Sequence, residues 1–144
     1  MVKVKEFLKS IVTIDEMIDI KVNEVAKLRV LIDVGAVRYD RDKVMGGGGD
    51  DKMADTVVKI VELEEEINKD IDTLVEHKKL AMDMIKSLDD DREQVILYKR
   101  YFEKKSFEQI SVDTNYSWRQ VHRLHGRALV VLDNKYKDVI ECHI

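Results

Sequence analysis

The feature that most constrains this chain is a run of apolar residues spaced alternately three and four positions apart. This spacing is that of a coiled-coil heptad, in which the repeated positions lie on one side of a helix. It predicts one helix over residues 4–33, about 45 Å long at the usual rise of about 1.5 Å per residue. The positions are Val4, Phe7, Ile11, Ile14, Ile18, Lys21, Val25, Leu28 and Ile32, and all but Lys21 are apolar.

The same spacing recurs over residues 52–88 and predicts a second long helix there. The chain contains no proline, and 38% of its residues are charged, which is typical of a mostly helical protein. Neither helix can bury its apolar stripe alone, so the simplest fold is an antiparallel hairpin. We therefore expect an all-α protein whose residues 1–88 form a long, coiled-coil-like helical hairpin. The second set of positions is Val57, Ile60, Glu64, Ile67, Ile71, Leu74, Lys78, Ala81, Ile85 and Leu88.

Residues 35–51 separate the two apolar repeats and include four consecutive glycines at 46–49. Four glycines lose too much backbone entropy on ordering to hold a helix, so we expect a long, mobile connection. A phosphate-binding loop is the alternative. It is disfavoured because the lysine followed by serine or threonine is missing, and because Asp50 and Asp51 would repel phosphate.

Further apolar residues lie beside the two repeats and widen each stripe. Pairing of the two helices would leave part of this apolar surface uncovered. We therefore expect self-association through the N-terminal helices, as a dimer or a four-helix arrangement. The acidic run at 62–66 is interpreted as a solvated face. The additional positions are Leu8, Val12, Val22, Val58, Val61 and Val75.

Several function classes are excluded by what the sequence lacks. The single cysteine, Cys142, cannot form an intramolecular disulfide and is typical of a reducing cytoplasm. An apolar run of about 18 residues, as a membrane span needs, is not found. His122 and His125 share roughly one helix face, but no further ligand completes a metal site, so His125 is interpreted as structural. We expect a cytoplasmic protein that is not an enzyme and has no cofactor, metal or membrane partner.

The C-terminal part, residues 89–138, is expected to form a separate domain. Residues 92–132 contain eight Lys and Arg against four Asp and Glu, whereas residues 1–91 contain 15 against 22. The acidic triplet at 89–91 can cap a new helix and favour its positive end. The local positive balance suits an anionic partner.

Two capping boxes follow in this domain. "SFEQ" at 106–109 and "SWRQ" at 117–120 each place serine three residues before glutamine, which is the pattern of a helix start. Asn115 falls where a tight turn needs a left-handed residue. A short helix, a tight turn and a second amphipathic helix predict a helix-turn-helix. The inward face is expected to consist of Phe107, Ile110, Tyr116, Val121, Leu124 and Ala128.

The second helix of this motif carries an unusual outward face near its start. In a helix-turn-helix, this end enters the major groove of DNA, where arginine can bind guanine through two hydrogen bonds. The start of each helix also offers N–H groups to phosphates. The alternative is that Trp118 packs against the preceding helix and the arginines are merely solvated. The outward set is Trp118, Arg119 and His122, with Arg123 at the edge.

The segment "RYFEKKSFEQISVDTNYSWRQVHRLHGRAL", residues 100–129, resembles region four of bacterial sigma factors, which reads promoters. The whole layout resembles a family of phage and prophage proteins described as sigma-factor-like, or as ArpU-like late transcription regulators. These share long N-terminal helices, a glycine-rich connection and an ending similar to "RLHGRAL" at 123–129. The resemblance implies binding of double-stranded DNA and control of phage late genes, with host RNA polymerase as a candidate partner.

The resemblance also implies roles for individual residues. Sigma factors usually carry charged groups where Trp118 and His122 stand, so the promoter sequence is not implied. The N-terminal 90 residues lack a recognisable polymerase-clamping region, so a complete sigma factor is not expected. The base-reading positions fall on Trp118, Arg119, His122 and Arg123. The phosphate-facing positions fall on Ser106, Ser117, Gln120 and Arg127, together with Lys104 and Lys105 in the turn before the first helix.

These patterns favour a sequence-specific transcription regulator of phage or prophage origin. An alternative is a phage assembly or DNA-packaging protein, similar to a small terminase, whose helices build a ring. Stoichiometry separates the two, because a dimer favours the regulator and a ring of eight or more favours packaging. A third alternative is a protein–protein module without DNA binding, which would show no salt-dependent affinity for DNA.

Overall fold

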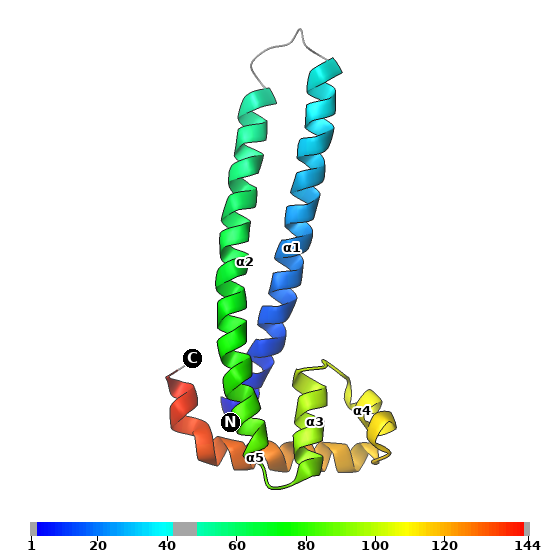
Figure 1. The fold of residues 1–144 in the computed structure, drawn as a ribbon. Helices are drawn as coiled ribbons and strands as arrows, with labels where there is room; N and C mark the ends of the chain where they lie inside the picture. Colours follow the sequence, from blue (N-terminus) through cyan, green and yellow to red (C-terminus); the bar gives the residue numbers. More distant parts are fainter. Residues whose placement is uncertain (1–2, 42–48, 143–144) are drawn as a thin grey trace. The chain divides into compact units, whose positions relative to one another are not determined.

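The computed structural model describes residues 3–41 and 49–142 of the 144-residue chain. The described residues form five helices and no strand, so the predicted all-α fold class is confirmed (Figure 1). None of these helices has an apolar stretch of the length that crosses a membrane. The helices are α1 (Lys3–Arg41), α2 (Gly49–Lys86), α3 (Asp91–Tyr101), α4 (Phe107–Thr114) and α5 (Trp118–Glu141).

The chain divides into two compact units, and each is described by itself. The hairpin unit is Asp15–Thr73. The terminal unit combines Met1–Ile14 with Leu74–Ile144. Helices α1 and α2 each contribute to both units, whereas α3, α4 and α5 belong to the terminal unit alone.

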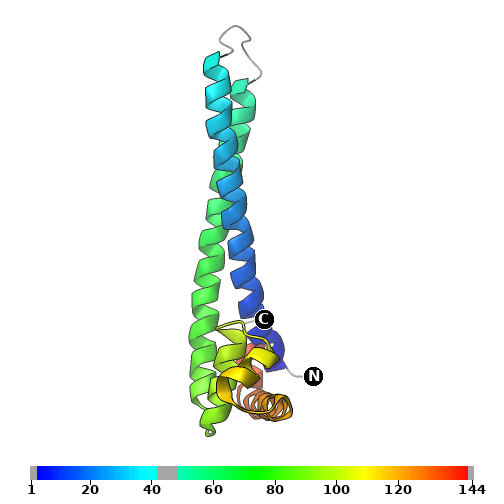
Figure 2. The ribbon, with the colours of Figure 1, turned by 90° about the vertical axis from the view of Figure 1, so that its right-hand side faces the viewer.

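In the hairpin unit, α1 and α2 run antiparallel, as the apolar repeats predict. The Lys21 Nζ lies 2.7 Å from Asp70 Oδ2, and Arg29 pairs with Glu64, so residue numbers rise along α1 as they fall along α2. The two helices lie side by side in both Figure 1 and Figure 2. The buried seam between the two helices contains Ile18, Val25 and Ile60.

The predicted connection between the two helices is wrong at both of its ends. Residues 35–41 continue α1, and α2 already begins at Gly49. A single glycine such as Gly35 costs a helix only about 1 kcal/mol, and each residue added to an existing helix gains a hydrogen bond. Residues 42–48, which hold most of the glycine run, lie outside the described part of the chain.

The predicted apolar seam is confirmed for α1 but only in part for α2. Every described seam position of α1 is buried or half-buried, whereas Val57 and Ile71 of α2 are exposed. An antiparallel partner covers only one side of a helix. On α2 that side includes Ile60 and Leu74, and the two exposed residues lie at its edge. The expected apolar surface beside the seam is present at Val22 and at several α2 valines, whereas Leu8 is fully buried and Val12 is half-buried.

In the terminal unit, α3, α4 and α5 pack around a shared core of Ile96, Ile110, Val121 and Leu124. Phe107 and Tyr116 pack against this core, and Ala128 is fully buried. The predicted inward face is therefore confirmed. The parts of α1 and α2 in this unit also contribute fully buried side chains, among them Val4, Phe7, Leu8, Ala81 and Met84.

The turn between α4 and α5 has the predicted conformation. Asn115 adopts φ 60° and ψ 19°, a left-handed conformation that asparagine tolerates well. Ser106 and Ser117 cap the two helices, and each serine Oγ accepts a hydrogen bond from the backbone N–H of the glutamine three residues later. In the described part of the chain, the glutamine side chains do not return these bonds. A short helix, a tight turn and a long helix thus follow one another, with α5 starting from an ordered cap.

Candidate nucleic-acid interface

The start of α5 presents three of the predicted residues to solvent. Trp118 is 53% exposed, and Arg119 and Arg123 are exposed as well. Neither arginine forms an ion pair with any residue in the described ranges. Because the Ser117 cap fixes the first turn, these side chains leave the helix from a defined position. A large aromatic ring and two available guanidinium groups therefore share one exposed helix start.

His122 does not belong to this exposed set, and its predicted outward position is wrong. Its ring centroid lies 3.9 Å from that of Trp118 and 4.2 Å from that of Phe107 on α4. The side chain is half-buried, and its Nε2 is buried with no hydrogen-bond partner in the described residues. The imidazole contacts Phe107 on one helix and Trp118 on the other. It therefore supports the exposed tryptophan ring. Trp118 thus lies against His122 of its own helix and remains half exposed, whereas the alternative has it packed against the preceding helix.

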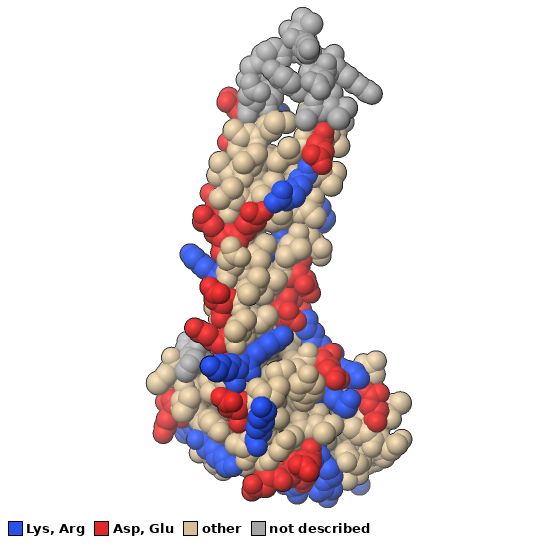
Figure 3. Space-filling model, in the orientation of Figure 1, with Lys and Arg blue, Asp and Glu red and all other residues tan. Residues whose placement is uncertain are grey.

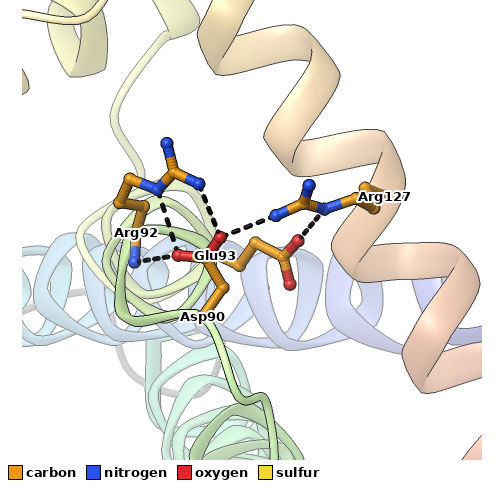
Figure 4. A network of polar contacts seen from close by, with 4 residues as sticks. All are labelled: Asp90, Arg92, Glu93 and Arg127. Atoms are coloured by element: carbon orange, nitrogen blue, oxygen red, sulfur yellow. Dashed lines mark hydrogen bonds and ion pairs between the residues drawn. The ribbon is translucent and has the colours of Figure 1, made fainter.

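Arg127 has a half-exposed guanidinium that already pairs with two carboxylates, which disfavours the phosphate-facing role implied by the resemblance (Figure 4). Its Nη2 lies 2.6 Å from Asp90 Oδ2, and its Nε donates to the carboxylate of Glu93. Glu93 is only 4% exposed, so the guanidinium neutralises a buried charge. Asp90 also accepts hydrogen bonds from the side chain and the backbone N–H of Arg92, which lower the pKa of its carboxyl group to about 2.

Sequence reasoning missed this network of Asp90, Arg92, Glu93 and Arg127. Asp90 does cap α3, as the acidic triplet predicts. Glu93 also stands in the first turn of α3, where an acidic residue is ordinarily explained by the helix dipole alone. Arg127 follows 34 residues later, and no local spacing connects the two.

Of the other predicted phosphate-facing residues, Ser117 and Gln120 lie at the start of α5, and Ser106, Lys104 and Lys105 lie at or before the start of α4. Lys105 donates to Asp113 at 2.6 Å and also pairs with Glu103 at 3.2 Å. Lys104 is exposed, with a left-handed backbone at φ 59°. Gln120 is half-buried, while Ser106 and Ser117 are exposed caps. The two serine caps and Gln120 lie at helix starts, where backbone N–H groups can meet an anion.

A buried polar pair lies beneath this surface. Tyr101 Oη lies 2.8 Å from Nε2 of His125, and both side chains are buried. Burial lowers the pKa of His125 to about 4, with a further contribution from the positive charges of Lys5 and Arg100. Burial also raises the pKa of Tyr101 to about 12. His125 is therefore neutral at pH 7 and structural, as predicted.

The chain was compared with protein families, with curated proteins and with solved structures. No curated protein matches the chain significantly. No solved structure matches it either. A family described as "protein of unknown function (DUF1492)" matches residues 33–133, which are more than two thirds of the chain. The chain belongs to this DUF1492 family.

Proposed function

We propose that this chain is a transcription regulator that binds specific sequences of double-stranded DNA through the start of α5. In this proposal Arg119 and Arg123 bind base edges in the major groove, and Trp118 contacts an apolar base edge such as the thymine methyl group. His122 acts indirectly, by supporting the Trp118 ring. The N-terminal turns of α4 and α5, capped by Ser106 and Ser117, bind backbone phosphates.

The observation that carries the proposal is a contrast among the cations of this segment. Arg92, Lys99, Lys105 and Arg127 all pair with carboxylates of the terminal unit. Arg119 and Arg123 do not pair with any described residue, and they flank an exposed tryptophan. A cation that stabilises the fold would have an internal partner. Two guanidinium groups without one, beside an exposed aromatic ring, suit a surface that meets an anionic ligand with apolar edges.

The resemblance of residues 100–129 to region four of sigma factors supports a more specific form of the proposal. The short helix, the left-handed turn residue and the capped second helix are arranged in the order of that region. ArpU-like phage regulators, which the layout resembles, suggest late-gene promoters as targets. Host RNA polymerase is the partner proposed with them.

The test measures affinity for a selected DNA site. A duplex would be selected from phage late-region fragments, labelled and titrated by fluorescence anisotropy. Arg119→Ala and Arg123→Ala are each expected to weaken specific binding by about 1–3 kcal/mol, because each removes a bidentate base contact. Lys137→Ala is the matched control, since this exposed cation lies on the same helix but far from its start.

Two results would count against the proposal. Affinity unchanged in both arginine variants would remove the base-reading role. A loss of affinity in Lys137→Ala equal to that in the arginine variants would indicate non-specific attraction. Circular dichroism of each variant establishes that helicity is intact.

A second candidate function is a phage assembly or DNA-packaging protein. The observation that favours it is the apolar surface left exposed on the hairpin unit, which suits a protein built of several copies. The measurement that separates the candidates is the mass of the particle in solution. A ring of eight or more copies would favour packaging over the regulator.

A further inference from the structure

The hairpin unit exposes apolar side chains that the pairing of its two helices does not cover. On α2, Val57, Val61 and Ile71 are between 41% and 49% exposed. On α1, Val22 and Val30 are 48% and 59% exposed. Figure 3 shows one side of the molecule, on which uncharged side chains cover much of α1 and α2, while charged ones form a diagonal row across it and line its edges. An apolar surface bordered by charges is typical of an interaction site.

On α2, a stripe of one half-buried residue, Glu64, and four exposed ones lies at the edge of the predicted seam and shares Val57, Glu64 and Ile71 with it. Val57, Val61, Glu64, Asn68 and Ile71 are spaced alternately four and three positions apart, so they lie along one side of the helix. In the sequence the next position of this spacing, 75, is also valine. The stripe is thus apolar towards its ends and polar in its middle.

An ion pair places a stripe of α1 on the same face of the hairpin. Arg29 of α1 pairs with Glu64, which belongs to the α2 stripe. Next to Arg29 on α1, the exposed residues Val22, Ala26 and Val30 recur at a spacing of four and so follow one side of the helix. One face of the hairpin unit therefore carries two parallel apolar stripes.

Both stripes are symmetric about a centre. On α2, Val61 and Ile71 lie five residues either side of position 66, and Glu64 and Asn68 lie two residues either side of it. On α1, Val22 and Val30 lie four residues either side of Ala26. Residue 25 of α1 lies midway between Lys21 and Arg29, and residue 67 of α2 lies midway between their partners Asp70 and Glu64. Because the two ion pairs join these residues across the hairpin, positions 25 and 67 lie at the same height along it. The two centres therefore lie at the same height on the hairpin, to within about one residue or 1.5 Å.

We infer that this face binds a second copy of the chain, with the two hairpin units antiparallel around a two-fold axis at that level. Reversal of a symmetric stripe places Val61 against Ile71 of the second copy and Val22 against Val30. The Asn68 amide can donate to the carboxylate of Glu64 of the second copy. Ala26 faces its own counterpart, and its small side chain allows close approach. Such an isologous contact is self-complementary, as a two-fold dimer requires.

The polar residues define the register and the extent of the contact. A polar pair within an apolar helix interface penalises shifted registers, because a shift would bury Glu64 or Asn68 against valine. Asp19 and Asp33, both exposed, lie seven residues either side of Ala26. In the dimer, Asp19 of one copy would lie opposite Asp33 of the other at the rim of the contact, where exposure to solvent keeps the repulsion weak. These two residues therefore mark the ends of the α1 stripe. The arrangement is a four-helix bundle of two hairpins, and it does not depend on DNA binding.

The first test is the mass of the full-length protein by analytical ultracentrifugation over a range of concentrations. The wild type is expected to be a dimer. Val61→Glu is expected to raise the dissociation constant by on the order of 100-fold or more, because the two-fold axis buries the new carboxylate twice. Val58→Glu is the matched control, since Val58 is 54% exposed on the same helix but lies outside the stripe.

Three results would overturn the inference. A wild-type monomer at all concentrations would remove the interface. A larger ring would replace the two-fold dimer. Equal effects of Val61→Glu and Val58→Glu would mean that the stripe is not the contact. Circular dichroism of both variants establishes that neither result comes from unfolding.

The second test determines the antiparallel register by disulfide cross-linking. In a Cys142→Ser background, which removes the exposed native cysteine, Val61→Cys and Ile71→Cys proteins are oxidised alone and as a mixture. The antiparallel contact predicts a cross-link in the mixture and much less in either protein alone. A cross-link in either protein alone as strong as that in the mixture, or no cross-link in the mixture, would overturn the proposed geometry.

Discussion

The two units of this protein differ in how completely they bury their own apolar residues. All of the largest fully buried side chains lie in residues 1–14 and 74–144, among them Phe7, Met84, Ile96 and Leu124. In the described residues of the hairpin unit, the most buried side chains are Ile60, Ile18 and Val25, at 6–9% exposure. The terminal unit has a closed core, whereas the hairpin unit has a seam between two helices.

The difference follows from the number of helices that surround the apolar residues of each unit. Several helices surround the core of the terminal unit, so apolar residues on different helix faces find partners. Two helices can cover only the sides that face each other, and a wide apolar stripe then remains partly exposed. The terminal unit can therefore hold a binding surface in place by itself. The hairpin unit is better suited to association.

The largest expected effect comes from opening the closed core. Leu124→Ala is expected to lower the free energy of unfolding by about 3 kcal/mol, because Leu124 is fully buried and its removal leaves a cavity. Ile60→Ala, at the hairpin seam, is expected to cost about half as much, since the seam can partly collapse or admit water. Urea denaturation followed by circular dichroism measures both. Equal losses would contradict the contrast between a closed core and an open seam.

A smaller effect is expected from acid, and it acts on the terminal unit. The His125 pKa is about 4 in the folded protein and about 6.5 in an unfolded chain, so at pH 5 only the unfolded state takes up the proton. The contribution of the neutral His125 to the free energy of unfolding is fully present above pH 6.5 and is lost as the pH falls towards 4. The expected loss between pH 7.5 and 5 is about 2 kcal/mol. Urea denaturation at the two pH values measures it, and His125→Gln should remove most of the difference. An equal pH dependence in that variant would assign the effect to other groups.

The smallest expected effect distinguishes a structural arginine from a DNA-binding one. Arg127→Ala leaves the buried carboxylate of Glu93 without its partner, and we expect a loss of about 1.5 kcal/mol, reduced because the guanidinium is half exposed. Thermal denaturation measures it. A Glu93→Gln, Arg127→Ala double variant should recover part of the loss. If Arg127→Ala instead weakened DNA binding without changing stability, the phosphate-facing role implied by the resemblance would be restored.

Features that depend on local spacing could be predicted from the sequence. The α1 seam, the serine caps, the left-handed Asn115 and the inward residues Val121 and Leu124 all follow from patterns within about ten residues. Such patterns determine which face of a helix is apolar and where the helix starts, and the structure confirms them.

Features that depend on distant partners could not be predicted in this way. His122 is covered by Phe107, which belongs to another helix, and Arg127 pairs with a carboxylate 34 residues earlier. An outward-facing position on one helix says nothing about the neighbour that covers it. The ends of α1 and α2 also do not follow from glycine content alone, because extension of a long helix gains hydrogen bonds that offset the entropy cost of a glycine.

The most direct test of the central claim uses the emission of Trp118, the only tryptophan in the chain. The protein would be titrated with duplex fragments from phage late regions at two salt concentrations, with a mobility shift run in parallel. DNA binding by the start of α5 predicts a saturable change in emission that favours one fragment and weakens as salt rises, because bound phosphates release counterions. Unchanged emission with no mobility shift on any fragment would contradict the account.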